Sequence, residues 1–165
     1  MPEYIAYCDG SYQESIKAGG WASIIIQDDC IIKKLYQGYK NTTNNRMELM
    51  GVIETLKYFK TPIKITIYSD SQYVVNSVNA GWVYNWYKNQ DFSKKNWDLW
   101  FKLIDLLAFH DVTLKWVKGH NVNKMNNFVD MLAVHAAQCL NIPEDEISTV
   151  ETKKDWESLV SRCST

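Results

Sequence analysis

The sequence predicts an α/β fold in which a mixed β-sheet is flanked by helices. Three β-rich runs with short connections open the chain and indicate an antiparallel meander. After them the spacing of apolar residues changes to the helical period, and helices then alternate with strands. Elements in this order pack as a sheet with helices against it. The chain of 165 residues is long enough for one domain with a substantial core.

The first three strands are predicted from their alternating pattern and from turn residues. Residues 3–9 alternate as a strand, and the runs 20–27 and 31–39 are rich in residues that favour strands. The pair Asp28-Asp29 between the second and third runs is a turn signal. Short connections of this kind favour antiparallel neighbours.

The first helix is predicted over residues 45–60, where apolar residues recur at mostly helical spacing. A Thr-Pro pair at 61–62 ends it, because proline removes a hydrogen-bond donor and restricts the residue before it. Residues 63–69 then alternate as a strand. A short helix over 71–79 follows, and Gly81 ends that helix.

The segment 82–95 is rich in aromatic residues and lysines and is predicted to be irregular. The remaining elements are a helix, a strand and a helix, over residues 97–109, 112–117 and 126–139. We place the domain boundary after residue 142. The acidic extension 143–165 begins with Pro143 and three acids, a pattern typical of a helix start, so we expect a short docked helix there. A partner-binding segment is the alternative.

The composition excludes several classes of protein. Apolar residues make up 46% of the chain and charged residues 22%, which argues against disorder. No apolar run approaches the ~20 residues of a membrane helix, and the N-terminus lacks the features of a signal peptide. The four cysteines show no CxxC spacing, so we expect reduced thiols, a cytoplasmic protein and no membrane partner.

The net charge of −1 does not by itself indicate a nucleic-acid-binding protein, but the charges are unevenly distributed. Residues 80–127 hold seven lysines and four acids, whereas residues 143–165 are acidic. A local basic face is therefore compatible with a neutral total. Ordinary solvated surface is the alternative explanation for these lysines.

Four carboxylates, those of Asp9, Glu48, Asp70 and Asp130, each stand in a distinctive local pattern. Hard divalent cations prefer oxygen ligands. Two such ions about 4 Å apart can activate water and stabilise the leaving oxygen in phosphodiester cleavage. The four acids together therefore predict a metal site.

Each acid also has a purely structural interpretation. Asp9 ends or interrupts its strand, and an Asp-Gly turn would explain it. A capping box with Asn45 would explain Glu48. Asp70 could simply cap the following helix, and Asp130 could be a solvated helical acid. Taken singly, each residue leaves this alternative open.

The residues that flank the four acids favour the metal site over the structural interpretations. Residues 42–49 read TTNNRMEL, residues 69–74 read SDSQYV, and Asp9 is followed by Gly10 and Ser11. With a Gly-His pair at 119–120, ten residues before Asp130, the chain resembles type 1 ribonuclease H over residues 3–139. The resemblance implies a five-stranded mixed sheet with three antiparallel strands, then parallel strands, and helices on both faces.

The same resemblance implies an endonuclease that hydrolyses the RNA strand of RNA/DNA hybrids and leaves 5′-phosphate and 3′-hydroxyl ends. Asp9, Glu48, Asp70 and Asp130 would bind two Mg²⁺ ions, with Mn²⁺ as a possible substitute. His120 would assist proton transfer or product departure, a task that suits its titration range. We expect a monomer without a small-molecule cofactor, with the hybrid duplex as its partner.

The resemblance also implies contacts to the hybrid. Asn44, Asn45 and Gln72 would reach 2′-hydroxyls and minor-groove edges, and Thr43 would contact a phosphate of the DNA strand. A basic, aromatic handle for that strand would contribute the following residues: Trp82, Trp86, Lys88, Lys94, Lys95 and Trp100. Capping and turn chemistry is the alternative for the polar residues, and core packing for the tryptophans.

Two rival functions remain at this stage. An integrase-like or resolvase-like DNA nuclease shares the fold, but the asparagine and glutamine set argues against it. A catalytically silent hybrid-binding module would not need four acids and His120. Motifs for nucleotide-binding loops, serine hydrolases and zinc sites do not occur in the chain. The first loop, residues 12–20, departs from many relatives, which have an asparagine near the position of Ser15.

Overall fold

The computed structural model describes residues 1–118 and 124–145. Its elements, in chain order, are β1 (Glu3–Gln13), the 3-10 helix η1 (Glu14–Ile16), β2 (Ala18–Gln27), β3 (Cys30–Lys40), α1 (Asn44–Lys57), β4 (Lys64–Ser69), α2 (Gln72–Asn79), α3 (Trp82–Lys88), α4 (Trp97–Phe109), β5 (Asp111–Trp116) and α5 (Lys124–Gln138). All nine segments predicted as strands or helices in the body are found, most with ends shifted by one to four residues.

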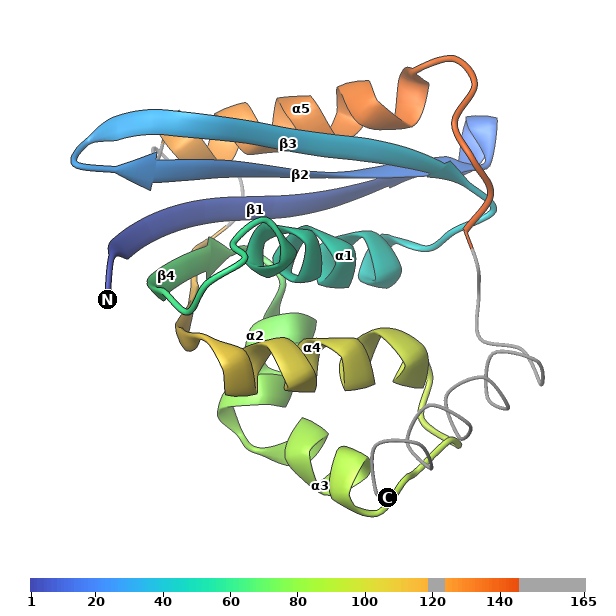
Figure 1. The fold of residues 1–165 in the computed structure, drawn as a ribbon. Helices are drawn as coiled ribbons and strands as arrows, with labels where there is room; N and C mark the ends of the chain where they lie inside the picture. Colours follow the sequence, from blue (N-terminus) through green and yellow to red (C-terminus); the bar gives the residue numbers. More distant parts are fainter. Residues whose placement is uncertain (119–123, 146–165) are drawn as a thin grey trace.

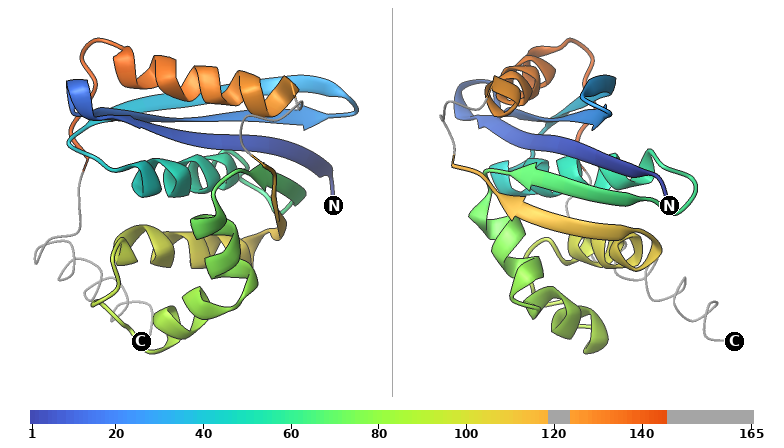
Figure 2. Two further views of the ribbon diagram at one scale, coloured as in Figure 1. Left: turned by 180° about the vertical axis from the view of Figure 1, so that it is seen from behind. Right: turned by 90° about the vertical axis from the view of Figure 1, so that its left-hand side faces the viewer.

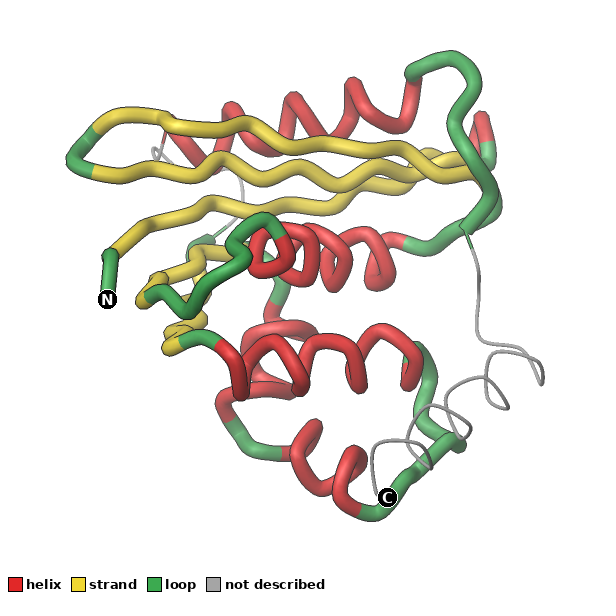
Figure 3. The backbone as a smooth tube through the Cα atoms, in the orientation of Figure 1, coloured by secondary structure: helices red, strands yellow, loops and turns green. Residues whose placement is uncertain are grey.

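The five strands form one sheet in the order β3-β2-β1-β4-β5 (Figures 1 and 3). β1 pairs antiparallel with β2, and β2 with β3, whereas β4 pairs parallel with both β1 and β5. This confirms the predicted mixed sheet. In Figure 2, α5 covers one face of the sheet, and α1 and α4 lie on the other.

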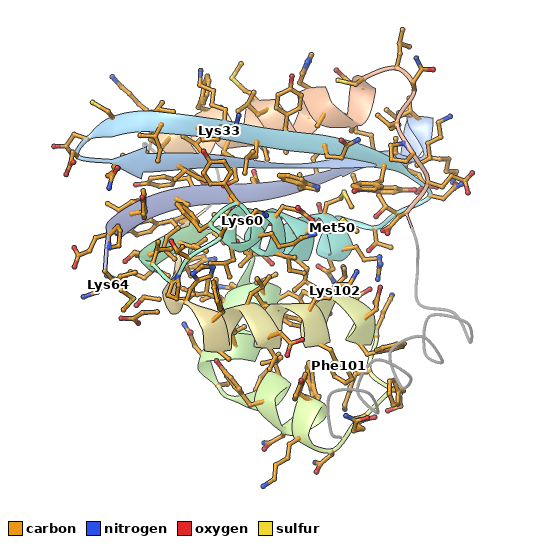
Figure 4. All side chains as sticks on the ribbon, viewed as in Figure 1. Lys33, Met50, Lys60, Lys64, Phe101 and Lys102 are labelled. Carbon is orange, nitrogen blue, oxygen red and sulfur yellow. The ribbon has the colours of Figure 1, made fainter. Side chains whose placement is uncertain are left out.

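Two apolar clusters hold the layers together, one on each face. The larger joins α1, α2, α3 and α4 to the sheet and includes fully buried Leu49, Leu56 and Trp100. The smaller joins α5 to β2 through Ala22, Ile24 and Val129, among others. Figure 4 shows side chains filling the layer between the sheet and α4. Burial of this apolar surface is the main term that favours the fold.

The segment 82–95 is the main correction to the predicted elements, because it contains the helix α3. Val83, Trp86 and Tyr87 pack against the larger cluster at helical spacing, so the signal was present in the sequence. Gly81 precedes the helix with φ of 83°, in the left-handed region that favours glycine. The aromatic residues thus serve a packed helix rather than an irregular loop.

Residues 143–145 are a second correction, because they are extended and do not begin a helix. Glu144 forms a parallel bridge with Lys40 at the end of β3. The Lys40 N–H donates to the carbonyl of Pro143 at 2.8 Å, and the Asp145 N–H donates to the carbonyl of Lys40 at 3.0 Å. The rest of the predicted tail helix lies outside the described residues, and the domain boundary stays a prediction.

Candidate active site

The site forms where β1 runs on beyond its parallel neighbour. β4 ends at Ser69, which pairs with Cys8, while β1 continues through Asp9 as far as Gln13. Past this point β4 no longer lies beside β1, so side chains from both faces of the sheet can meet there. Asp9 is therefore the first residue of β1 that such side chains can approach from both faces.

Gly10 brings α1 onto the strand at this position. A methyl group on Gly10 would overlap the backbone nitrogen of Glu48 and the carbonyl carbon of Met47. The first turns of α1 therefore pack directly against β1, which places Glu48 beside Asp9. The alternative interpretation of the Asp-Gly pair as a turn is wrong, because both residues lie within a continuous strand.

The start of α1 is capped by Thr43, whose Oγ1 accepts a hydrogen bond from the Arg46 N–H at 3.2 Å. Asn45 lies within the helix, so the capping-box interpretation of Glu48 is wrong as well. Glu48 is buried and directed at the site instead of at the helix end.

Asp70 directly follows β4 and does not cap α2. That role belongs to Ser71, whose Oγ accepts from the Val74 N–H at 3.2 Å. The indole Nε1 of Trp116 donates to the backbone carbonyl of Asp70 at 3.1 Å. Neighbouring parallel strands thus present Asp9 and Asp70 at the same edge of the sheet.

Asp130 reaches the site from α5, on the opposite face from α1. The helix can lie close to the sheet because Gly20 and Gly38 have no side chains at the contact. A methyl group on either would overlap the backbone carbonyl of Ala133 or Ala136. Asp130 is half-buried, and its nearness to Asp9 is one of the causes that raise the pKa of the Asp9 carboxyl. It is therefore not a fully solvated helical acid.

The three carboxylates of Asp9, Glu48 and Asp70 each offer an oxygen, and these oxygens lie within 4.8 Å of one another. Only 2% of Asp9 and 5% of Glu48 is exposed, so water cannot disperse their charge. Asp130 is not in this group of three but approaches it at Asp9. The four acids predicted from the sequence are thus brought to one place.

Burial is the first cause that raises the pKa of the Asp9 carboxyl, and the charges of Glu48 and Asp70 add to it. Burial likewise raises the pKa of Glu48, followed by the charge of Asp70. Carboxylates that share a site resist losing their protons together.

The hydrogen bonding of the carboxylate oxygens shows whether the site suits a cation. Asp9 Oδ1 accepts from the Gly10 N–H at 2.8 Å. Asp9 Oδ2 and Glu48 Oε2 are buried, and neither has a hydrogen-bond partner within residues 1–118 and 124–145. A buried anionic oxygen without a donor is costly unless a cation neutralises it. The donor set therefore fits a hard divalent ion.

The polar residues predicted to contact nucleic acid lie close to two of the acids along the chain. Thr43, Asn44 and Asn45 form the start of α1, which leads into Glu48, and Gln72 opens α2 just after Asp70. Asn44, Asn45 and Gln72 are exposed. His120, the fifth predicted catalytic residue, lies outside the described residues.

The predicted handle divides into exposed and buried parts. Trp82 is 53% exposed, and Lys88 and Lys95 are exposed. The Nζ of Lys94 lies 5.4 Å from the ring centroid of half-buried Trp86. Trp100 has no exposed surface, so its predicted contact with nucleic acid is corrected to a packing role: it supports Trp86, with the ring centroids 5.9 Å apart.

Trp116 and Arg46 are two residues near the site whose roles the sequence analysis missed. Trp116 is 44% exposed and holds the backbone of Asp70. Arg46 is buried between two acids from distant segments. The only sequence signal for either was its position beside a recognised motif, since their partners lie far away along the chain.

Comparisons with known proteins agree with this geometry. A model of the RNase H family matches residues 1–138. A ribonuclease H of Caldicellulosiruptor saccharolyticus is 42% identical over 139 residues, which cover 81% of this chain and 94% of the relative. The ribonuclease HI of a Synechocystis species is 39% identical over 137 residues, which cover 80% and 86% respectively.

Solved structures show the same fold at lower identity. The crystal structure of a type 1 RNase H with the type 2 active-site motif matches with a TM-score of 0.72 at 24% identity. That match covers 99% of this chain and 84% of the other. The N-terminal RNase H domain of a Mycobacterium tuberculosis protein matches with a TM-score of 0.67 at 18% identity, covering 84% and 95%.

Proposed function

Because the chain belongs to the ribonuclease H family, we propose that its acidic site is that of an endonuclease for the RNA strand of RNA/DNA hybrids. One observation carries the proposal. Three carboxylates, one from β1, one from α1 and one from the residue that follows β4, have oxygens within 4.8 Å of one another. Two of their buried oxygens have no donor among the described residues. Such an arrangement is costly for folding and is explained by cation binding.

We infer that the ions are Mg²⁺, held by Asp9, Glu48, Asp70 and Asp130. When bound, a pair of such ions supplies a nucleophilic water and stabilises the leaving oxygen. The protein itself contributes the placement of the ligands. β1 and β4 hold Asp9 and Asp70 rigidly, and the contact at Gly10 fixes Glu48. Ligands fixed on strands and a packed helix need little rearrangement before the reaction.

The remaining predicted residues serve recognition and proton transfer. Exposed amides of Asn44, Asn45 and Gln72 are suited to 2′-hydroxyls, which distinguish RNA from DNA. Exposed Trp82 with Lys88 and Lys95 is suited to the DNA strand, through stacking and charge. These contacts go to sugar and phosphate, so sequence preference should be weak. His120 would assist proton transfer or product departure.

The location and oligomeric state stay predictions, namely a cytoplasmic monomer. Across the residues that the structure covers, no helix is both long enough and apolar enough to cross a bilayer.

The test is a cleavage assay with matched substrates of one sequence: an RNA/DNA hybrid, a DNA duplex and an RNA duplex, each with Mg²⁺ or Mn²⁺. We expect cleavage of the hybrid alone, with 5′-phosphate ends on the RNA products. Cleavage of the DNA duplex would instead favour an integrase-like nuclease. Tight binding of the hybrid without cleavage in either metal would indicate a silent binding module.

A further inference from the structure

Arg46 is a buried cation that links three segments distant in sequence. Its Nη1 and Nη2 donate to the two oxygens of Asp98 at 3.0 and 2.9 Å. Its Nε and Nη2 donate to the two oxygens of Asp145 at 2.7 and 3.2 Å. The Arg46 side chain is 1% exposed, and that of Asp145 is also 1% exposed. The guanidinium fork is thus paired with one carboxylate on each side.

Asp145 is itself firmly held. Its backbone N–H is paired with Lys40 at the end of β3, and its Oδ2 accepts a hydrogen bond from the Thr42 hydroxyl at 2.6 Å. A carboxylate anchored at both backbone and side chain can fix the position of the group that it binds. Here that group is Arg46.

Two of the three segments that meet at Arg46, the start of α1 and the start of α4, adjoin residues predicted to contact the hybrid. Asn44 and Asn45 directly precede Arg46 in the first turn of α1, and Thr43 caps that turn. Asp98 lies in the first turn of α4, immediately after the handle segment. The Nη1 of Arg46 also donates to Asn96 Oδ1 at 3.3 Å, at the junction of handle and helix.

We propose that Asp145 is a positioning residue for substrate binding, which acts through Arg46 to hold the first turn of α1 and the end of the handle in one arrangement. The proposal rests on the proposed hybrid cleavage. It makes the three residues after the predicted domain boundary a working part of the catalytic domain. Asp145 touches neither the reacting atoms nor the acid cluster in this scheme.

The alternative is that the Arg46–Asp145 salt bridge only stabilises the fold. A variant that lacks the Asp145 carboxylate can distinguish this from a positioning role. In the Asp145→Ala variant, Asp98 still neutralises Arg46, so no unpaired buried charge remains. The fold should therefore persist, while the anchor at residues 143–145 loses its hold on Arg46. A residue that only stabilises the fold would lower the melting temperature without changing the affinity of the folded enzyme.

The experiment uses the full-length chain and steady-state cleavage of a hybrid well below the melting temperature. Asp145→Ala should raise KM by about tenfold and leave kcat within about twofold, as expected when binding is lost and chemistry is kept. Glu144→Ala is the matched control, because it removes the same charge from an exposed neighbour. The control should keep the wild-type KM.

A double-mutant cycle with Asn45→Ala then tests whether Asp145 affects KM by positioning the first turn of α1. If Asp145 acts by placing the turn that carries Asn45, the loss caused by Asn45→Ala should be smaller in the Asp145→Ala background. Additive effects, or no effect of Asn45→Ala at all, would overturn the proposal. So would an unchanged KM in Asp145→Ala. Failure of the wild type to cleave the hybrid would instead count against the proposed function.

Discussion

Gly10 in β1 lies against the backbone nitrogen of Glu48, and no side chain larger than hydrogen fits between them. This contact sets the distance between the first turn of α1 and the strand that carries Asp9. The φ angle of Gly10 is not in the left-handed region, so the requirement for glycine is steric and not conformational. The geometry of the acid cluster therefore depends on the absence of a Cβ atom at Gly10.

We predict that Gly10→Ala displaces α1, lowers hybrid cleavage by roughly 10²-fold, and costs about 1–3 kcal/mol of unfolding free energy through overpacking. Gly51→Ala is the control within α1, because a methyl group there meets only ordinary contacts at 3.4 to 3.6 Å. The control should be neutral or stabilise by up to about 1 kcal/mol. Cleavage rates and urea denaturation measure both variants, and equal activity of the two would contradict the steric argument.

Removing the charge of a proposed ligand should abolish cleavage. Asp9→Asn, Glu48→Gln and Asp70→Asn each replace an anionic oxygen by an amide, which is a poorer ligand for a hard cation. Mutation of a residue that only hydrogen-bonds to a metal ligand typically lowers metal affinity or activity by about 10–100-fold. Loss of a ligand itself should therefore lower the cleavage rate by more than about 10²-fold. Asp28→Asn, at an exposed turn, is the control and should retain activity. Near-normal cleavage by Asp9→Asn would refute the metal assignment.

Without metal, the acid cluster should destabilise the fold as pH rises. The pKa values of Asp9 and Glu48 are raised in the folded state, so the native protein binds protons there more readily than the unfolded chain. This contribution favours folding at low pH. It is lost as the pH rises from the ordinary carboxyl range of about 4 through the folded-state pKa, about 8 for Glu48.

In a chelating buffer near neutral pH, Asp9→Asn should therefore melt higher than the wild type, and the difference should shrink toward about pH 4. Each kcal/mol corresponds to roughly 2–4 °C for a chain of this size. Mg²⁺ should raise the melting temperature of the wild type by mass action, and the variant should lose most of that response. A lower melting temperature of Asp9→Asn in chelator would mean that the hydrogen bond from Gly10 to an ionised Asp9 matters more.

The handle lysines should contribute to affinity in a salt-dependent way. If Lys88, Lys94 and Lys95 contact phosphates, their triple alanine variant should bind the hybrid more weakly at every sequence. The slope of log affinity against log salt should flatten by about 0.9 for each lost contact.

A triple alanine variant of Lys57, Lys60 and Lys64 is the matched control for the handle. These exposed lysines lie at or before the start of β4, whereas Asp70 follows its other end. Filter binding over a salt series measures both triples. An unchanged slope in the handle variant would mean that its lysines are solvated surface.

Local patterns in the sequence were enough for most of the elements and for the identity of the acids. The helix over residues 97–109 was predicted with the bounds that the structure has, because its apolar spacing is long and regular. The strings around Asp9, Glu48 and Asp70 are each continuous in the sequence, so their resemblance to a family could be recognised without knowing the fold. That these acids meet in one site was expected from the preference of hard cations for carboxylates and from that resemblance, not from any local pattern.

The tertiary structure alone decided features that depend on contacts between distant segments. Gly10 looked like a turn residue until α1 was seen against it, and Trp100 looked like a handle residue until its full burial was known. Residues 143–145 carry a helix-start pattern, yet pairing with Lys40 and the bond from Asp145 to Arg46 hold them extended. A local pattern specifies what a segment favours in isolation, whereas these outcomes depend on which other segments it meets.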